Sequence, residues 1–214
     1  MRIAVINENS QASKNSIIVE ELKRVVEPKG YIVHNYGMYS AEDENQITYV
    51  EVGLLTAILI NAGAADFVVT GCGTGEGAML AANSFPNVLC GHVCDASDAY
   101  MFSQINAGNS IAMPFAKGFG WGAELNLRYV FEKLFEQEPG GGYPKERVVP
   151  EQRNKKILDE VKKITHNNMI TILENIDKEL LNHVLKLDGF KKYFAENAKD
   201  NEVTKYILDY IKNM

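Results

Sequence analysis

Short and almost entirely apolar runs alternate with longer helix-period segments through the first 115 residues of this 214-residue chain. Five runs rich in β-branched residues predict strands at Ile3–Ile6, Tyr31–His34, Phe67–Thr70, Val88–His92 and Ser110–Met113. The segments between them have helical spacing, at Ser16–Val26, Val50–Ala62, Gly77–Asn83 and Ala96–Asn106. Strands that are apolar throughout are typical of a sheet covered on both faces, and these repeat lengths favour parallel pairing. The sequence therefore predicts an α/β fold, a doubly wound α/β/α sandwich with a five-stranded parallel sheet.

The rest of the chain carries no strand pattern. Gly120–Phe135 predicts one more helix on the sheet, and the glycines and prolines of Gly140–Pro150 predict a break. Beyond that break, apolar residues recur at three- and four-residue intervals in Glu151–Ile164, Met169–Leu187, Phe190–Asn197 and Val203–Ile211. We expect an α/β domain over residues 1–150 and a helical extension over residues 151–214. The extension is too small to form an independent core, so it docks on the body or on a second subunit.

Charge and composition exclude several classes of protein. Residues 1–150 hold 10 Lys and Arg against 17 Asp and Glu, and residues 151–214 hold 12 against 11. An acidic body without a basic stripe argues against nucleic acid as a partner. No apolar run approaches the ~18 residues of a membrane span. The first residues read as a buried strand rather than an export signal, and three cysteines argue against a disulfide framework, so we expect a cytoplasmic protein.

A glycine-rich loop, TGCGTGEG, follows the third predicted strand and opens a helix at residues 70–77. Ligands of open parallel sheets bind beyond the carboxyl ends of the strands, where backbone N–H groups of such loops attract negative charge. Gly73, Gly75 and Ala78 also satisfy the dinucleotide fingerprint G-x-G-x-x-A. That fingerprint belongs after a first strand, so a phosphate, a carboxylate or a developing oxyanion is the better prediction.

Cys72 lies inside this loop. A thiol at a helix N-terminus experiences the positive end of the helix dipole, which favours the thiolate. A thiolate surrounded by amides suits nucleophilic attack on a carbonyl, or removal of a proton next to a carbonyl with the oxyanion held by the amides. The four histidines lie in predicted strands or in the extension, so proton transfer is favoured. The structural alternative is a small buried cysteine beside a turn.

The segment GCGTGEGAMLAAN, Gly71–Asn83, resembles the signature of the ribose-5-phosphate isomerase B and galactose-6-phosphate isomerase family. The resemblance extends over about residues 1–150. It implies a Rossmann-like body, a homodimer with active sites at the subunit boundary, and aldose–ketose isomerisation that uses neither a metal nor another cofactor.

The resemblance also implies residue roles. Cys72 matches the base that moves a proton between adjacent carbons through an enediolate, and Thr74 matches a hydroxyl that orients the sugar. Glu8 takes the place of a substrate-contacting Asp, and Arg147 matches one of the family's phosphate-binding arginines. The complete set of expected site residues is Cys72 and Thr74 for catalysis, with Glu8, Asn9, Gly71, Gly73, Gly75, Gly77, Asp95, Asn109 and Arg147 for substrate.

Several departures from the family pattern bear on the substrate. Cys94 replaces the histidine credited with ring opening, and Tyr100 and Tyr143 replace two phosphate-binding arginines. Phosphate recognition depends on such cations, so an open-chain acidic sugar such as 4-deoxy-5-hexosulose uronate competes with a small sugar phosphate as the expected substrate. The alternative function is a non-catalytic sugar- or nucleotide-binding protein of the same fold.

Cys90, His92 and Cys94 alternate in sequence, so on a strand all three would point to one face. Two thiolates and an imidazole are zinc ligands. We favour the interpretation that Cys90 and His92 are neutral side chains packed in a buried sheet, so we expect no metal.

Overall fold

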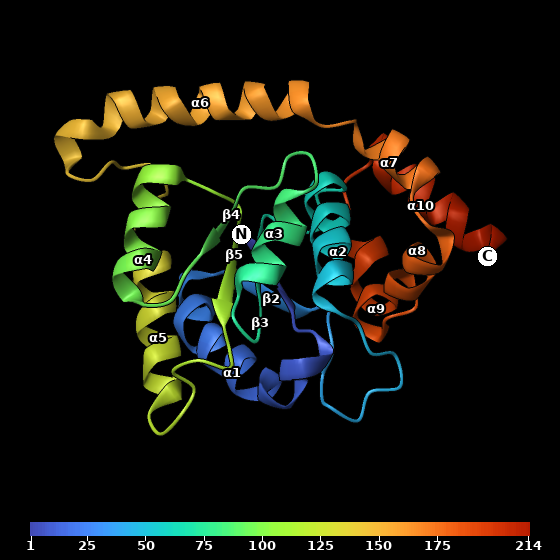
Figure 1. The fold of residues 1–214 in the computed structure, drawn as a ribbon, viewed down its shortest axis with the longest axis horizontal. Helices are drawn as coiled ribbons and strands as arrows, with labels where there is room; N and C mark the ends of the chain where they lie inside the picture. The colour runs from blue at the N-terminus through green and yellow to red at the C-terminus, as the bar shows by residue number, and fades with distance from the viewer.

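The computed structural model describes residues 1–214 and contains one five-stranded sheet, in which every pair of neighbouring strands is parallel (Figure 1). The order across the sheet is β2-β1-β3-β5-β4. The strands are β1 (Arg2–Ile6), β2 (Ile32–Asn35), β3 (Phe67–Cys72), β4 (Cys90–His92) and β5 (Ser110–Pro114). The predicted α/β/α sandwich with five parallel strands is thereby confirmed.

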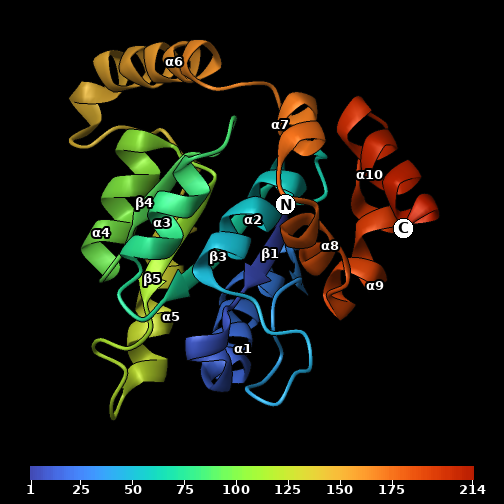
Figure 2. The ribbon, with the colours of Figure 1, turned by 45° about the vertical axis from the view of Figure 1, so that its right-hand side comes forward.

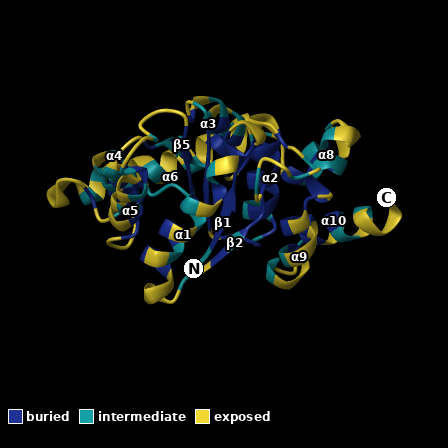
Figure 3. Cartoon of the chain, turned by 90° about the horizontal axis from the view of Figure 1, so that it is seen from below, coloured by how far each residue is buried: buried dark blue, intermediate teal, exposed yellow.

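Helices cover both faces of this sheet, as the apolar strands require. The helices of the α/β part are α1 (Asn15–Val26), α2 (Tyr49–Asn61), α3 (Glu76–Asn83), α4 (Ala96–Met101) and α5 (Ala123–Leu134). Side chains alternate along each strand: Ala4 and Ile6 pack with α2 and α3, whereas Ile3 and Val5 pack with α1 and α5. Figure 3 shows the buried strands enclosed between helices whose outer faces are exposed.

The remaining helices are α6 (Val148–Thr165), α7 (Met169–Asn175), α8 (Lys178–Leu185), α9 (Asp188–Asn197) and α10 (Glu202–Asn213). Short helical turns occupy Asn9–Lys14, Glu27–Lys29, Phe102–Asn106 and Lys145–Arg147. None of the helices is long and apolar enough to span a bilayer.

Two helix predictions need correction. The single helix expected over Met169–Leu187 is wrong, because Ile176 is extended and Asp177 caps α8 by accepting the N–H groups of Glu179 and Leu180. The break expected to end at Pro150 is also too long. Helix α6 begins at Val148 and holds Pro150 in its first turn, where the missing N–H of proline costs no hydrogen bond.

The extension docks on the body through α2. Figure 2 shows α7 to α10 gathered on the side of α2 that faces away from α3. Leu181 and Leu185 of α8 and Phe190 and Phe194 of α9 belong to the same buried cluster as the residues of α2. Helix α2 is therefore enclosed on both sides.

Helix α6 forms an arm with its apolar side outward. Figure 1 shows it spanning the top of the molecule, with the β5 arrow pointing away from it. Ile157, Val161 and Ile164 lie on one helix face and are 55%, 46% and 84% exposed. Lys162 points inward instead, and its Nζ donates to the carbonyl oxygen of Asn83 across 3.0 Å. This inversion leaves an apolar stripe uncovered on the arm.

Candidate active site

The strand order places a crevice at the carboxyl ends of β1 and β3. The chain connects β1 to β2 on one side and β3 to β5 and β4 on the other, so the connections diverge between β1 and β3. Ligands of open α/β sheets bind at this divergence. The segments that leave these two strands are the ones that hold Glu8, Asn9 and the glycine-rich loop.

The glycine-rich loop folds over the end of β5. The N–H groups of Phe115 and Ala116 donate to the carbonyl oxygens of Cys72 and Gly73, both across 2.9 Å. A Cβ on Gly71 would lie 2.3 Å from the carbonyl oxygen of Met113, so only glycine allows this approach. Gly75 has a φ of +80° at the start of α3, a conformation that also favours glycine.

Cys72 is the last residue of β3 and retains 7% of its surface exposed. Its Sγ accepts a hydrogen bond from the backbone N–H of Gly75 across 3.2 Å. Thr74 is exposed, and its Oγ1 accepts from the N–H of Glu76 across 3.3 Å. The loop therefore holds a sulfur in contact with a backbone donor, beside a hydroxyl that faces solvent.

Two polar side chains follow β1. Glu8 is 3% exposed, and its carboxylate accepts from the N–H of Ser10 across 3.0 Å and from its hydroxyl across 2.6 Å. Asn9 has an exposed side chain and donates its backbone N–H to Ile47 across 2.8 Å. The structure thus brings Glu8 and Asn9 to the same sheet edge as Cys72 and Thr74.

Two residues of this edge were missed by the sequence reasoning. Lys14 Nζ donates to Gln11 Oε1 across 2.7 Å and to the carbonyl oxygen of Phe115, the residue bonded through its N–H to Cys72. The Gln11 amide in turn lies 3.9 Å from the position that a Cβ on Gly73 would take. Both lie in the turn Asn9–Lys14, directly after Glu8, so extending the predicted site to the end of that turn would have included them.

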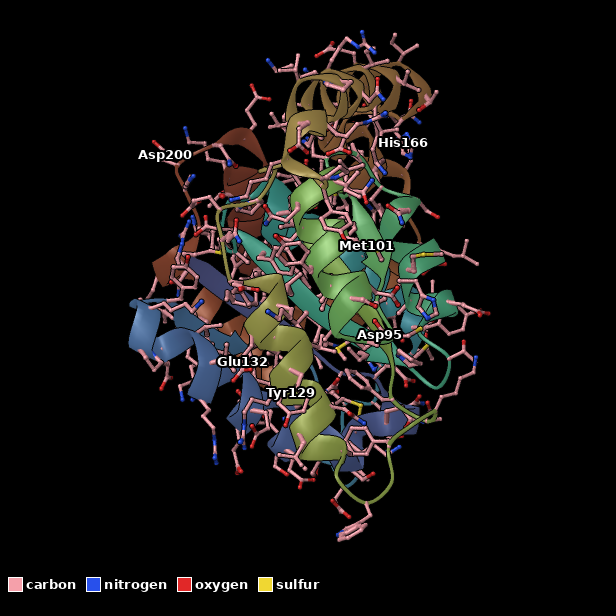
Figure 4. All side chains as sticks on the ribbon, turned by 90° about the vertical axis from the view of Figure 1, so that its left-hand side faces the viewer. Asp95, Met101, Tyr129, Glu132, His166 and Asp200 are labelled. Atoms are coloured by element: carbon pink, nitrogen blue, oxygen red, sulfur yellow. The ribbon has the colours of Figure 1, made fainter.

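Asp95 follows β4 and acts mainly as a helix cap. Its Oδ1 accepts from the N–H of Asp98 across 2.9 Å and from the Ser97 hydroxyl across 2.7 Å. The Ser97 hydrogen bond holds the pKa of Asp95 below its usual value, so the carboxylate stays ionised. Figure 4 shows Asp95 at the end of α4, with Met101 further along the helix.

Two expected substrate residues lie at the opposite edge of the sheet, and a third lies at the start of α3. Asn109 precedes β5, where it bridges Leu89 and Asn87, so the length of β5, about 16 Å, separates it from the edge that holds Cys72. Arg147 is exposed and directly precedes α6, the helix that Figure 1 shows away from the tip of the β5 arrow. Gly77 is the second residue of α3, directly after the loop, and a Cβ there would meet the Tyr49 ring of α2 at 3.1 Å.

The alternating residues Cys90, His92 and Cys94, the last of which lies beyond β4, have different surroundings. Cys90 is buried, which raises the pKa of its thiol to about 12, whereas Cys94 is exposed. His92 lies between them, with Nε2 2.8 Å from the carbonyl oxygen of Thr74. No group of three or more His, Cys, Asp or Glu side chains is arranged to hold a metal ion.

None of the larger cavities is lined by Cys72. One of about 560 Å³ lies between α1 and α5, one of about 460 Å³ is lined by β4, α4 and Leu158 of α6, and one of about 320 Å³ lies between α6 and the turn at Asn87.

A parallel α/β sheet that presents a cysteine, a hydroxyl and a glycine-rich loop at its point of divergence defines an α/β protein with a site for a small anionic ligand or oxyanion at that edge. Comparisons with known proteins agree: a family model described as Ribose/Galactose Isomerase matches residues 3–140, and one described as Ribose-5-phosphate isomerase matches residues 164–209. The chain belongs to the ribose/galactose isomerase family and is a sugar isomerase.

Two solved structures are similar over nearly the whole chain. The crystal structure of a 4-deoxy-L-threo-5-hexosulose-uronate ketol-isomerase complexed with a tartrate is 59% identical, covers 100% of both chains and has a TM-score of 0.96. A ribose-5-phosphate isomerase from Vibrio parahaemolyticus is 43% identical, covers 98% of both chains and has a TM-score of 0.94. A ribose 5-phosphate isomerase from Thermotoga maritima is 23% identical over 74% of this chain and 97% of its own, with a TM-score of 0.57, and shares the fold.

Proposed function

We propose that this protein is a ketol-isomerase of an open-chain acidic sugar, 4-deoxy-5-hexosulose uronate, in which Cys72 transfers the proton. The observation that carries the proposal is the Gly75 N–H bond to Cys72 Sγ, because it holds the sulfur at the mouth of β3, inside the loop whose backbone N–H groups can stabilise an oxyanion. The 59% identity to a ketol-isomerase with this substrate supports the same choice.

In the proposed reaction the Cys72 thiolate removes the proton from the hydroxyl-bearing carbon next to the carbonyl. The electron pair of that C–H bond forms the enediolate double bond, and the carbonyl π electrons move to its oxygen. Backbone N–H groups of the glycine-rich loop stabilise that negative charge. The Cys72 thiol then returns the proton to the former carbonyl carbon, and the hydroxyl proton passes to the other oxygen, so no electrons leave the sugar.

The neighbouring polar groups have distinct proposed roles. Thr74, Glu8 and Asn9 hold substrate hydroxyls, and Asp95 faces them from the end of β4. Lys14 supplies a cation close to Phe115, which suits a single carboxylate better than a phosphate dianion. Gly71, Gly73 and Gly75 shape the loop that receives the oxyanion.

We propose a homodimer in which the second copy completes each site. Asn109 and Arg147 reach a Cys72 edge only from another chain, since within one chain they lie at the opposite edge of the sheet. Helix α6 is the proposed contact with that copy. This contact is supported by its exposed apolar stripe, which consists of Ile157, Val161 and Ile164.

The proposed division of the chain keeps the α/β isomerase domain over residues 1–150 and the helical extension over residues 151–214. Helices α7 to α10 of that extension pack on α2. A cytoplasmic location is part of the proposal, because a reducing compartment prevents oxidation of Cys72 and so keeps its sulfur available for proton transfer.

The test is product NMR in D₂O with purified protein and two substrates, 4-deoxy-5-hexosulose uronate and ribose 5-phosphate. The expected result is turnover of the uronate with deuterium at the accepting carbon. A clear preference for ribose 5-phosphate would contradict the uronate as the substrate and would indicate a sugar phosphate instead. Saturable binding of either sugar without turnover would indicate a non-catalytic binding protein.

A further inference from the structure

His92 contacts the glycine-rich loop from the far side of β5. It ends β4, where it pairs with Ala112 of β5, and its ring extends past the end of β5 to the loop. Its Nε2 lies 2.8 Å from the carbonyl oxygen of Thr74, and a Cβ on Gly75 would lie 2.8 Å from the same nitrogen. The imidazole is thus packed directly on the backbone of the Thr74–Gly75 peptide.

That peptide also holds Cys72. Its carbonyl oxygen, from Thr74, faces His92, and its N–H, from Gly75, donates to Cys72 Sγ across 3.2 Å. A carbonyl oxygen can only accept, so His92 Nε2 carries the proton and donates it. A donor on the carbonyl end of an amide polarises the amide and strengthens the hydrogen bond given by its N–H end.

A second cysteine contacts the same ring without choosing between its nitrogens. Cys94 Sγ lies 3.8 Å from His92 Nδ1 and 3.9 Å from His92 Nε2. This nearly equal spacing makes Cys94 a packing neighbour of the imidazole. The tautomer of His92 is therefore assigned from the contact with Thr74 alone.

We propose that His92 is a positioning residue for the isomerase reaction, and that it acts through the Thr74–Gly75 peptide to hold the Gly75 N–H on Cys72, in a relay that runs from His92 Nε2 to Cys72 Sγ. The role rests on the proposed function of Cys72. His92 does not touch substrate in this arrangement, because the loop lies between its ring and the sulfur.

The test compares variants at residue 92 that differ in the donor they retain. The amide nitrogen of the glutamine in His92→Gln reaches about as far as Nε2 and can still donate to Thr74, whereas His92→Leu has similar bulk and no donor. Met101→Ala is the matched control, since Met101 lines the cavity that His92 lines and contacts no member of the relay. Each variant is measured for kcat, KM and melting temperature.

The expected kcat falls about tenfold in His92→Leu with KM nearly unchanged, which is the effect of one lost hydrogen bond on a transition state. We expect His92→Gln to recover most of that kcat and Met101→Ala to match the wild-type protein. Equal kcat losses in His92→Gln and His92→Leu would overturn the relay and leave His92 a packing residue. A wild-type kcat in His92→Leu would also overturn it.

A second readout separates this inference from the proposed function. Alkylation of Cys72 by iodoacetamide at a fixed neutral pH, followed by peptide mass spectrometry, reports the reactivity of that sulfur without any substrate. The relay requires slower Cys72 alkylation in His92→Leu than in the wild-type and His92→Gln proteins. Unchanged alkylation in His92→Leu overturns the relay, whereas slower alkylation in a protein without isomerase activity overturns only the proposed function.

Discussion

His34 of β2 stacks on Tyr193 of α9, with the ring centroids 4.4 Å apart and the ring planes 27° apart. This contact joins the edge of the sheet to the helical extension. Burial lowers the pKa of His34 below its usual value, so the ring is neutral in the folded protein at neutral pH. Docking of the extension is therefore linked to pH.

The first prediction concerns that linkage. Because the folded-state pKa of His34 lies below that of the unfolded chain, its contribution to stability is complete above pH ~6.5 and is lost as the pH falls through the folded-state value. We expect the wild-type melting temperature to fall between about pH 7.5 and pH 5 by more than that of His34→Phe, which keeps the stacked ring and cannot be protonated. Parallel curves for the two proteins would remove His34 as a cause.

The second prediction concerns Cys72. Cys72→Ala should lower the rate of deuterium incorporation from solvent by at least about 100-fold, because general acid–base groups contribute factors of this order. Cys90→Ala is the matched cysteine control: its thiol is buried, with its pKa raised to about 12, and takes no part in proton transfer. Full exchange in Cys72→Ala would assign the proton transfer to another residue.

The third prediction concerns Lys14. Lys14→Met should raise KM for the uronate by about tenfold with little change in kcat, since a lost hydrogen bond between charged groups has this magnitude. Lys191→Met makes the same change in net charge on the exposed surface of α9, away from the site, and should leave KM unchanged. An equal rise in KM in both variants would indicate a general charge effect rather than a carboxylate contact.

The fourth prediction concerns the apolar stripe of α6. The double variant V161E/I164E should have about half the wild-type molar mass by size-exclusion chromatography with light scattering, because charges on the stripe oppose burial. Its isomerase activity should fall by at least about tenfold if the second copy completes the site, a loss larger than one hydrogen bond explains. Lys163→Glu, in the same turn and 61% exposed, should keep the wild-type mass. A molar mass of V161E/I164E equal to that of the wild-type protein would place the dimer contact elsewhere.

Local sequence was sufficient for the elements and for the centre of the site. The runs Ile3–Ile6 and Phe67–Thr70 are apolar throughout because both faces of the strands are covered, and they lie inside β1 and β3. Glycine is required at two positions around the glycine-rich loop. A Cβ on Gly71 would clash with Met113, and Gly75 has a positive φ. Cys72 was identifiable because its strand, its loop and its helix are encoded by consecutive residues, from Phe67 to Asn83.

Tertiary structure alone decided which distant residues meet. The order β2-β1-β3-β5-β4 brings His92 past β5 to Thr74 and leaves Asn109 at the other edge, and no local periodicity contains that order. The turn after β1 brings Lys14 to Phe115, more than a hundred residues away in the chain. Helix propensity and hydrophobic spacing act over a few residues, whereas these contacts arise from packing of whole layers.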